Sequence, residues 1–327
     1  MPIPSPRLRS ALFLVCTITI AVIAVSAQVP PSNWMKLSTA HYPSARAAAA
    51  VAYDPVSQKI ILFGGFGPTS YFNGTWVFDG TDWKRLAIRN KPPARAAASI
   101  AFDATLQKLV MYGGFNGSQY LGDTWIWDGA TSTWTQAFPT RSPNPETGPM
   151  LFTDPMTGRV DNFGGWDGMF YSLTTWRWRD GSWHKLSLPQ VPGARGSAVC
   201  ATNPELKQTV LFGGLADVNP VNTWTFNGVA WTEQFPANQV PYRFYASTIY
   251  DPRFQGVVVF AGFEGQDAND TWLWTGSNWQ QLSPTNSPPV RESAGIAFDE
   301  VNQQTVIFGG LSGNTLLHDT WVLQNTN

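Results

Sequence analysis

The chain has 327 residues and a formal net charge of −1, from 21 lysines and arginines against 22 aspartates and glutamates. This near-neutral balance gives no support to nucleic-acid binding or to adsorption on an anionic membrane, and we expect neither partner. A chain of this length can bury enough surface to fold without disulfides.

The first 27 residues are predicted to be a secretory signal peptide. Arg7 and Arg9 precede an apolar run over residues 11–25, and Val25-Ser26-Ala27 has the small-x-small form of a cleavage site. We therefore expect a single mature domain over residues 28–327 in a secreted or periplasmic location. Retention of the leader as an anchor stays an alternative, although a run of about 15 residues is short for a membrane span.

A glycine pair recurs six times along the rest of the chain, with alanine replacing the first glycine once. The steps between successive pairs are 48 to 51 residues. Self-similarity at a fixed period indicates a repeat architecture, in which each unit buries its faces against its neighbours. The pairs are Gly64-Gly65, Gly113-Gly114, Gly164-Gly165, Gly213-Gly214, Ala261-Gly262 and Gly309-Gly310.

Each repeat is predicted to form four short strands. The first is a run of small apolar residues, as in residues 47–53, and ends at an aspartate turn such as Asp54-Pro55. The second is a β-branched run that ends in the glycine pair, as in residues 59–65. The third alternates as Thr-Trp-x-Trp or Thr-Trp-x-Phe, and the fourth reads Trp-x-x-Leu. No stretch shows a helical period, so we expect an all-β fold.

Fifteen of the 16 tryptophans occupy fixed positions in the repeat, and we interpret them as packing between repeats rather than as ligand contacts. One series lies in the predicted third strands and a second in the fourth strands, with Trp34 as a displaced member of the second. The third-strand series is Trp76, Trp125, Trp176, Trp224, Trp272 and Trp321, with Trp127, Trp178 and Trp274 beside it. The fourth-strand series is Trp83, Trp134, Trp183, Trp231 and Trp279.

The glycine pair, the Thr-Trp strand, the Trp-x-x-Leu strand and the arginine opening the next unit resemble the kelch repeats of β-propellers such as the central domain of galactose oxidase. The resemblance covers about residues 33–323 and implies an all-β, six-bladed kelch-type β-propeller. The last repeat stops after its third strand, at residues 319–323, and the missing fourth strand is found at residues 33–37. We expect this N-terminal strand to complete the last blade and close the ring, which removes an exposed strand edge.

The sequence lacks the motifs of several enzyme classes. The three histidines, His41, His184 and His318, are not spaced as a metal pair, and no Gly-x-Ser-x-Gly elbow or phosphate-binding glycine loop occurs. Copper oxidases with a kelch propeller need several histidine and tyrosine ligands and a modified cysteine, whereas Cys200 is alone in the predicted mature chain. We therefore expect no metal, no cofactor and no internal disulfide.

An arginine stands eight residues before the turn aspartate or asparagine in five repeats, and Glu146 takes this position in the third. Since the position opens the innermost strand, we expect these side chains to ring one mouth of the central channel. They are interpreted either as part of the kelch template, bonding to loop carbonyls or packing on tryptophan, or as a site for a carboxylate ligand. The resemblance permits the second interpretation, because arginines at this position line the binding face of kelch propellers that bind acidic peptides. The five are Arg46, Arg95, Arg195, Arg243 and Arg291.

Departures from the repeat mark further candidate ligand-binding residues. Trp166 is the one tryptophan outside the pattern and begins an aromatic loop that includes Tyr171. Tyr245 replaces a small residue in the fifth repeat, and Glu292 follows the arginine of the sixth. Aromatic rings beside a few polar groups suit a peptide or carbohydrate surface. The alternative is that these loops are variable surface without a ligand.

Two functions follow from these features. The first is a secreted, monomeric interaction module that binds an anionic peptide, a glycan or a protein partner on its loops. The second is a carbohydrate-active enzyme similar to a sialic-acid mutarotase, an epimerase in which Glu146 or Glu292 is a weak candidate for general acid and base. The lack of a catalytic motif favours the first. A structural module of a larger surface assembly is a third option.

Overall fold

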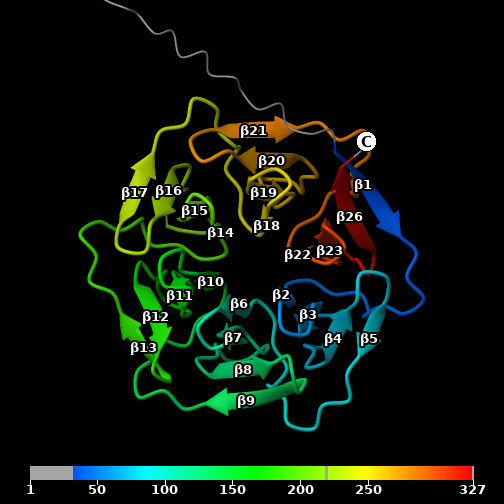
Figure 1. Ribbon diagram of the computed structural model, residues 1–327, viewed down its shortest axis with the longest axis horizontal. Helices are drawn as coiled ribbons and strands as arrows, with labels where there is room; N and C mark the ends of the chain where they lie inside the picture. The colour runs from blue at the N-terminus through cyan, green and yellow to red at the C-terminus, as the bar shows by residue number, and fades with distance from the viewer. Residues whose placement is uncertain (1–31, 218–219, 326–327) are drawn as a thin grey trace, which may run out of the picture.

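The computed structural model describes residues 32–217 and 220–325, which form six four-stranded antiparallel sheets arranged as blades around one axis (Figure 1). This confirms the six-bladed, all-β propeller that the repeat predicts. The predicted leader, residues 1–27, lies outside the described residues. Within the described ranges, no helix combines the length and hydropathy needed to cross a bilayer.

Blades one to five each contain four strands in chain order from the axis outward. Blade one consists of β2 (Ala50–Asp54), β3 (Lys59–Phe63), β4 (Thr75–Phe78) and β5 (Trp83–Arg85). Blade two consists of β6 (Ser99–Asp103), β7 (Lys108–Tyr112), β8 (Thr124–Asp128) and β9 (Thr133–Ala137). Blade three consists of β10 (Met150–Thr153), β11 (Val160–Phe163), β12 (Thr175–Arg179) and β13 (Ser182–Lys185). Blade four consists of β14 (Val199–Asn203), β15 (Gln208–Phe212), β16 (Thr223–Phe226) and β17 (Trp231–Gln234). Blade five consists of β18 (Ser247–Asp251), β19 (Gly256–Phe260), β20 (Thr271–Trp274) and β21 (Trp279–Leu282).

Blade six is built from both ends of the described chain. Its inner strands are β22 (Gly295–Asp299), β23 (Gln304–Phe308) and β26 (Thr320–Asn325), and its outermost strand is β1 (Ser32–Leu37). β1 pairs antiparallel with β26 from Ser32 opposite Asn325 to Leu37 opposite Thr320. The predicted closure by the N-terminal strand is therefore confirmed, and the outer edge of β26 is paired rather than exposed.

The outermost tryptophans join neighbouring blades, as the sequence predicts. The six members are fully buried, and each indole N–H donates to the threonine hydroxyl that begins the third strand of the preceding blade, at 2.9 to 3.1 Å. Trp134 of blade two, for example, donates to Thr75 of blade one at 2.9 Å. A buried indole N–H needs such an acceptor, so the Trp and Thr positions of the repeat form one inter-blade contact.

The glycine pair is required because the next blade lies against it. Gly64 has a φ of +73°, and a Cβ added there would lie 2.5 Å from the carbonyl oxygen of Arg95 in blade two. Gly65 donates its N–H to the same carbonyl at 2.8 Å. A side chain at Gly64 would therefore meet both a strained backbone and a neighbouring blade.

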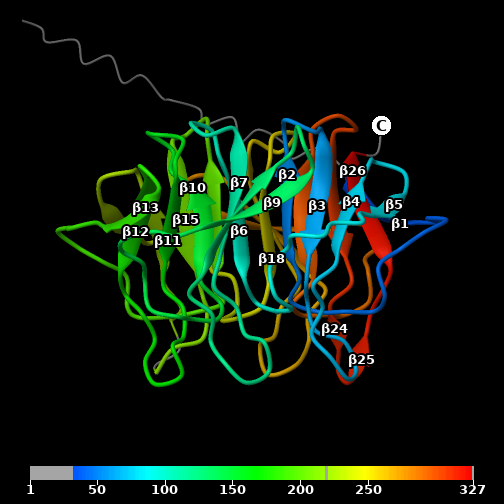
Figure 2. The same cartoon turned by 90° about the horizontal axis from the view of Figure 1, so that it is seen from below.

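Strand direction alternates within each blade, so the connections lie on two opposite faces of the disc. The turns after the first and third strands form one face, which we call the turn face. The loops after the glycine pairs and the connections between blades form the other, which we call the loop face. In Figure 2 these longer connections extend below the sheets, together with the hairpin of β24 (Leu311–Ser312) and β25 (Thr315–Leu316).

Candidate functional site

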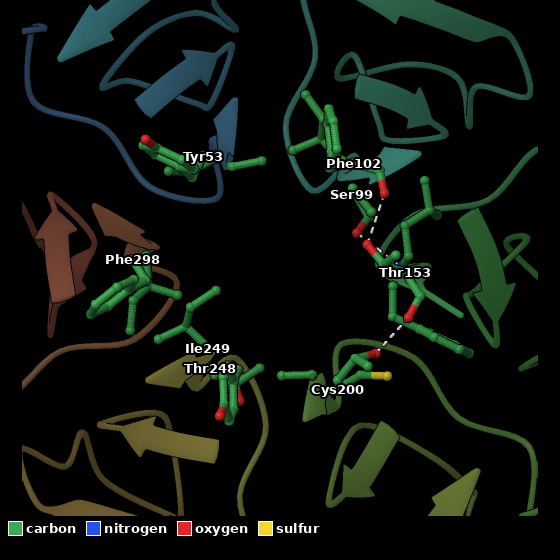
Figure 3. Close-up of a pocket in the computed structure, with 18 of the residues that line it drawn as sticks. Tyr53, Ser99, Phe102, Thr153, Cys200, Thr248, Ile249 and Phe298 are labelled. Atoms are coloured by element: carbon green, nitrogen blue, oxygen red, sulfur yellow. Dashed lines mark hydrogen bonds between the residues drawn. The ribbon is translucent and has the colours of Figure 1, made fainter. Parts of the chain in front are cut away.

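The innermost strands surround a central channel with a volume of about 1180 Å³ (Figure 3). Its wall consists mostly of small and apolar side chains, and several of its hydroxyl groups are used within the fold. Thr153 Oγ1 donates to the carbonyl of Phe102 at 2.8 Å, and Thr202 Oγ1 donates to the carbonyl of Thr153 at 2.7 Å. Among the residues that line the channel, the charged ones are acidic, namely Asp154, Glu205 and Glu300.

A closed ring of backbone hydrogen bonds surrounds the loop-face end of this channel. Each member donates its N–H to the carbonyl of the equivalent residue in the preceding blade, at 2.8 to 3.1 Å. All six have left-handed backbone, with φ between 51° and 62°. Five are small, whereas Tyr245 places a bulky side chain in a conformation that such residues rarely adopt. The members are Ala48, Ala97, Gly148, Ser197, Tyr245 and Ser293.

The five predicted arginines are buried between the loops of neighbouring blades, with at most 3 % of each exposed. Each donates from Nη1 to the carbonyl of the first residue of its own glycine pair, at 2.8 to 3.2 Å, as Arg46 does to Gly64. Each also donates from Nε to the carbonyl two residues before it. The interpretation that they bond to loop carbonyls is confirmed.

The sequence predicts that these arginines ring the channel mouth, but their buried guanidinium groups do not line the channel. Arg46, Arg95, Arg195, Arg243 and Arg291 are all absent from the wall of the channel. The physical reason is that the carbonyls beside the glycine pairs lack a strand partner and need a donor, which the guanidinium supplies. A ligand-binding role for these arginines stays a prediction.

Three of these arginines form buried ion pairs with an aspartate that precedes the Thr-Trp strand. Arg95 pairs with Asp123 at 2.6 Å, and Asp123 also accepts the indole N–H of Trp125 at 2.7 Å. Burial raises the pKa of Asp123, but the hydrogen bonds and the charge of Arg95 outweigh burial and hold this pKa below its usual value. Sequence reasoning missed these carboxylates, although an Asp-Thr-Trp triplet marks each of them. The other two pairs are Arg243 with Asp270 and Arg291 with Asp319.

The remaining two arginines have no carboxylate within ion-pair distance in the described part of the chain. Arg46 lies over the ring of Phe72, 4.2 Å from its centroid, and burial followed by the nearby Arg85 lowers its pKa to about 10. Arg195 donates to Asn222 Oδ1 at 3.3 Å, and burial lowers its pKa to about 10 as well.

Glu146 lies inside blade three and not at a surface. Its side chain accepts a hydrogen bond from Asn162 Nδ2 at 2.8 Å, and only 1 % of the residue is exposed. Burial raises the pKa of Glu146 to about 8. A substrate on either face of the disc could not contact this carboxyl in the arrangement described.

The same blade contains a buried charge cluster that sequence reasoning missed. Arg177 in β12 pairs with Asp161 in β11 at 2.8 Å and with Asp154 in the turn between β10 and β11 at 2.7 Å. The signal was present in the sequence, because β11 contains Asp161-Asn162 where the other blades have apolar residues. This cluster and Glu146 together give blade three a polar interior. Two buried carboxylates face one guanidinium in the cluster, and burial raises the pKa of Asp161 to about 7.

Aromatic side chains extend across the loop face from blade one to blade three. In blades one and two, neighbouring rings are 5.1 to 6.5 Å apart between centroids. In blade three, Trp166 and Tyr171 are 4.5 Å apart, and the ring of Tyr120 from blade two lies against Gly168 of the same loop. We call this set the aromatic arc; its members are Phe66, Tyr71, Phe115, Tyr120, Trp166 and Tyr171. Two further apolar side chains in the loop of Trp166 are exposed, Met169 at 71 % and Phe170 at 66 %. Sequence reasoning found Trp166 and Tyr171 but missed the others, which follow the glycine pair in the same way.

Two other predicted site residues lie near each other on blades five and six. Glu292 is half-buried, and burial followed by the charge of Asp267 raises its pKa to about 7. Burial, then Glu292 and Tyr171, raise the pKa of Tyr245. Tyr245 also packs against Phe244, with 5.1 Å between ring centroids. The charge of Glu292 thus acts on Tyr245. Glu146 and Glu292 belong to blades three and six, which lie on opposite sides of the ring (Figure 1).

The sequence model of one protein family, described as the KLHDC2/KLHL20/DRC7 Kelch-repeats domain, matches residues 24–214. The comparison with curated proteins yields no match.

Proposed function

Because the chain belongs to the kelch-repeat family, we propose that it is a secreted interaction module that binds a protein or peptide partner on its loop face. Kelch β-propellers are in general protein-interaction modules. The secreted location rests on the basic residues, apolar run and small-x-small triplet of residues 1–27.

The observation that carries this proposal is the apolar surface at the end of the aromatic arc. Met169 and Phe170 expose most of their side chains beside Trp166 and Tyr171. Aromatic residues and methionine are enriched in protein interfaces, and a contiguous exposed apolar patch marks an interaction site more often than scattered single residues do. The side chain of Asp167 holds this loop, since its Oδ1 accepts the backbone N–H groups of Met169 and Phe170 at 2.9 and 2.8 Å. The patch is therefore pre-organised for a partner.

A glycan is a second candidate ligand, because the faces of aromatic rings also suit sugars. An epimerase acting on an acidic sugar has weaker support. The arginines that would hold the sugar carboxylate are buried, and so is Glu146. Glu292 alone is half-buried with a pKa suited to proton transfer near neutrality.

The test is selection of displayed random peptides on the purified protein, followed by affinity measurement with a Met169→Ser, Phe170→Ser double variant. We expect the selected peptides to lose about tenfold or more in affinity for this variant. The control is a Leu206→Ser, Val229→Ser double variant, which removes exposed apolar side chains from the turn face. Peptides that bind the loop-face variant as tightly as the unchanged protein would contradict the proposal.

A further inference from the structure

In blades three to six, the charges left accessible on the loop face are mainly carboxylates, although the sequence places a series of arginines there. Three arginines are neutralised by aspartates, and Arg243 takes Glu264 as a second carboxylate partner at 3.2 Å. By contrast, four acidic side chains of blades three to six have no basic partner within ion-pair distance in the described residues. They are Asp167, Asp217, Asp267 and Glu292.

Basic residues are missing from the same region of the loop face. The four loops between glycine pair and third strand in blades three to six contain no lysine or arginine. Arg141 and Lys185 lie away from these loops, because Lys185 is in the outermost strand of blade three and the carbonyl of Arg141 accepts the N–H of Trp183 in that strand. The exposed Arg85 belongs to the outermost strand of blade one. We call the loop face of blades three to six, which contains these four carboxylates, the acidic sector.

The acidic sector lies beside aromatic rings. Ser293, the residue after Glu292, donates its backbone N–H to the carbonyl of Tyr245 at 2.8 Å, and Asp267 pairs with Phe263 in an isolated β-bridge. Consistent with this arrangement, Glu292 raises the pKa of Tyr245 after burial does. The side chain of Asp267 accepts a backbone N–H from Gly313 of blade six. This hydrogen bond holds Asp267 near Glu292, whose pKa its charge raises. Carboxylates next to aromatic faces attract an ammonium or guanidinium group by two mechanisms at once, charge pairing and cation–π interaction.

We propose that the loop face of blades three to six selects a basic, apolar segment of the partner protein. A lysine or arginine of that segment meets Glu292 and Asp267, while its apolar side chains pack on Trp166, Met169 and Phe170. This inference rests on the proposed interaction function and adds the chemistry of the partner. The expected ligand charge is positive, whereas the arginine series predicts an anionic ligand. The two differ because charge complementarity depends on accessible charges and not on buried charges that are already paired.

The experiment uses three fluorescent peptides of equal length and identical apolar residues, with lysine, glutamine or glutamate at the polar positions. Binding is measured by fluorescence anisotropy at low and high ionic strength. We expect the lysine peptide to bind tightest and to weaken with salt, as an interaction between accessible charges must. Glu292→Gln and Asp267→Asn should each weaken the lysine peptide by about five- to tenfold and leave the glutamine peptide unchanged.

Glu300→Gln is the control, because Glu300 is an exposed carboxyl, also with a raised pKa, at the turn-face end of the channel. The inference is overturned if the glutamate peptide binds as tightly as the lysine peptide, or if Glu300→Gln weakens binding as much as Glu292→Gln does. If binding is independent of peptide charge but is lost in the Met169→Ser, Phe170→Ser variant, the interaction function stands and the charge inference fails. If no peptide responds to any loop-face substitution, both fail.

Discussion

The indole N–H of Trp34 donates to the hydroxyl of Thr271 at 3.1 Å, across the boundary between blades six and five. Trp34 belongs to β1, which is separated from the rest of blade six by almost the whole chain. This hydrogen bond therefore joins the displaced strand to the preceding blade, as the equivalent Trp–Thr hydrogen bonds join the other neighbouring blades. The N-terminal strand is tied both to β26 by its backbone and to blade five by its side chain.

Trp34→Ala is expected to lower the free energy of unfolding by about 3–5 kcal/mol, because it empties a fully buried site and leaves the hydroxyl of Thr271 without its donor. Urea unfolding followed by far-UV circular dichroism measures this change. Met35→Ala, at an exposed position of the same strand, serves as control and should change stability by less than about 0.5 kcal/mol. Equal effects of the two substitutions would show that β1 does not hold the ring closed through Trp34.

The arginine series predicts two different stability effects. Arg95→Met leaves Asp123 without its ion-pair partner and should lower the free energy of unfolding by about 3–5 kcal/mol. Arg195→Met removes hydrogen bonds to carbonyls, but it leaves no carboxylate without an ion-pair partner. We therefore expect the free energy of unfolding to fall by a smaller amount, about 1–3 kcal/mol. Thermal and urea unfolding of both variants provide the comparison. If neither substitution changes stability, the arginines are free for a ligand, as the carboxylate-site hypothesis requires.

Glu146 predicts a pH dependence of stability. Burial raises its pKa from 4.5 to about 8, so between these values the folded chain keeps a proton that the unfolded chain releases. The contribution of this group is fully present below the unfolded pKa, and the free energy of unfolding falls as pH rises toward the folded pKa. Glu146→Gln removes the titration, so its advantage over the unchanged protein should grow from about pH 5 to about pH 9. Urea titrations at both pH values test this, and parallel pH profiles for the two proteins would contradict it.

Glu292 gives a prediction for binding rather than stability. Its pKa is raised to about 7 by burial and by Asp267, and Tyr245 is the other titratable group in its field. Since only the ionised carboxylate attracts a cation, the affinity for the lysine peptide should increase as pH rises through about 7. In the Glu292→Gln variant this rise should disappear while the weaker binding stays constant. A rise of the same size in that variant would assign the effect to another group.

The ring of blades could be predicted because the residues that make its main inter-blade contacts recur at fixed positions of the repeat. The Trp and Thr positions recur in every unit, and their inter-blade hydrogen bond explains why both residue types are kept at a fixed spacing. The strand that closes the ring could be found in the same way, since the Trp34 segment has the pattern that the last repeat lacks.

The candidate site was predictable only in part. The spacing of Arg95 places it correctly on the loop face, but spacing does not show whether a long side chain points outward or folds back onto its own strand end. Its partner Asp123 lies 28 residues later, across a loop of variable sequence. The charge accessible to a ligand therefore depends on pairings that become visible only in the folded chain, and the sign predicted from the arginines alone differs from the sign of the exposed carboxylates.

The hydrogen-bonded ring around the channel has a consequence for motion. Because every link runs in the same sense from one blade to the preceding one, the links form a circuit without a terminal member. Breaking the hydrogen bond of Ala48 to widen the ring would strain the hydrogen bond of Ser197 on the opposite side. We therefore expect the six hydrogen bonds of the ring to open together or not at all. The amide protons of this circuit should then exchange with solvent at a common rate, and a partner bound at one sector of the loop face should slow exchange at the sectors that it does not touch.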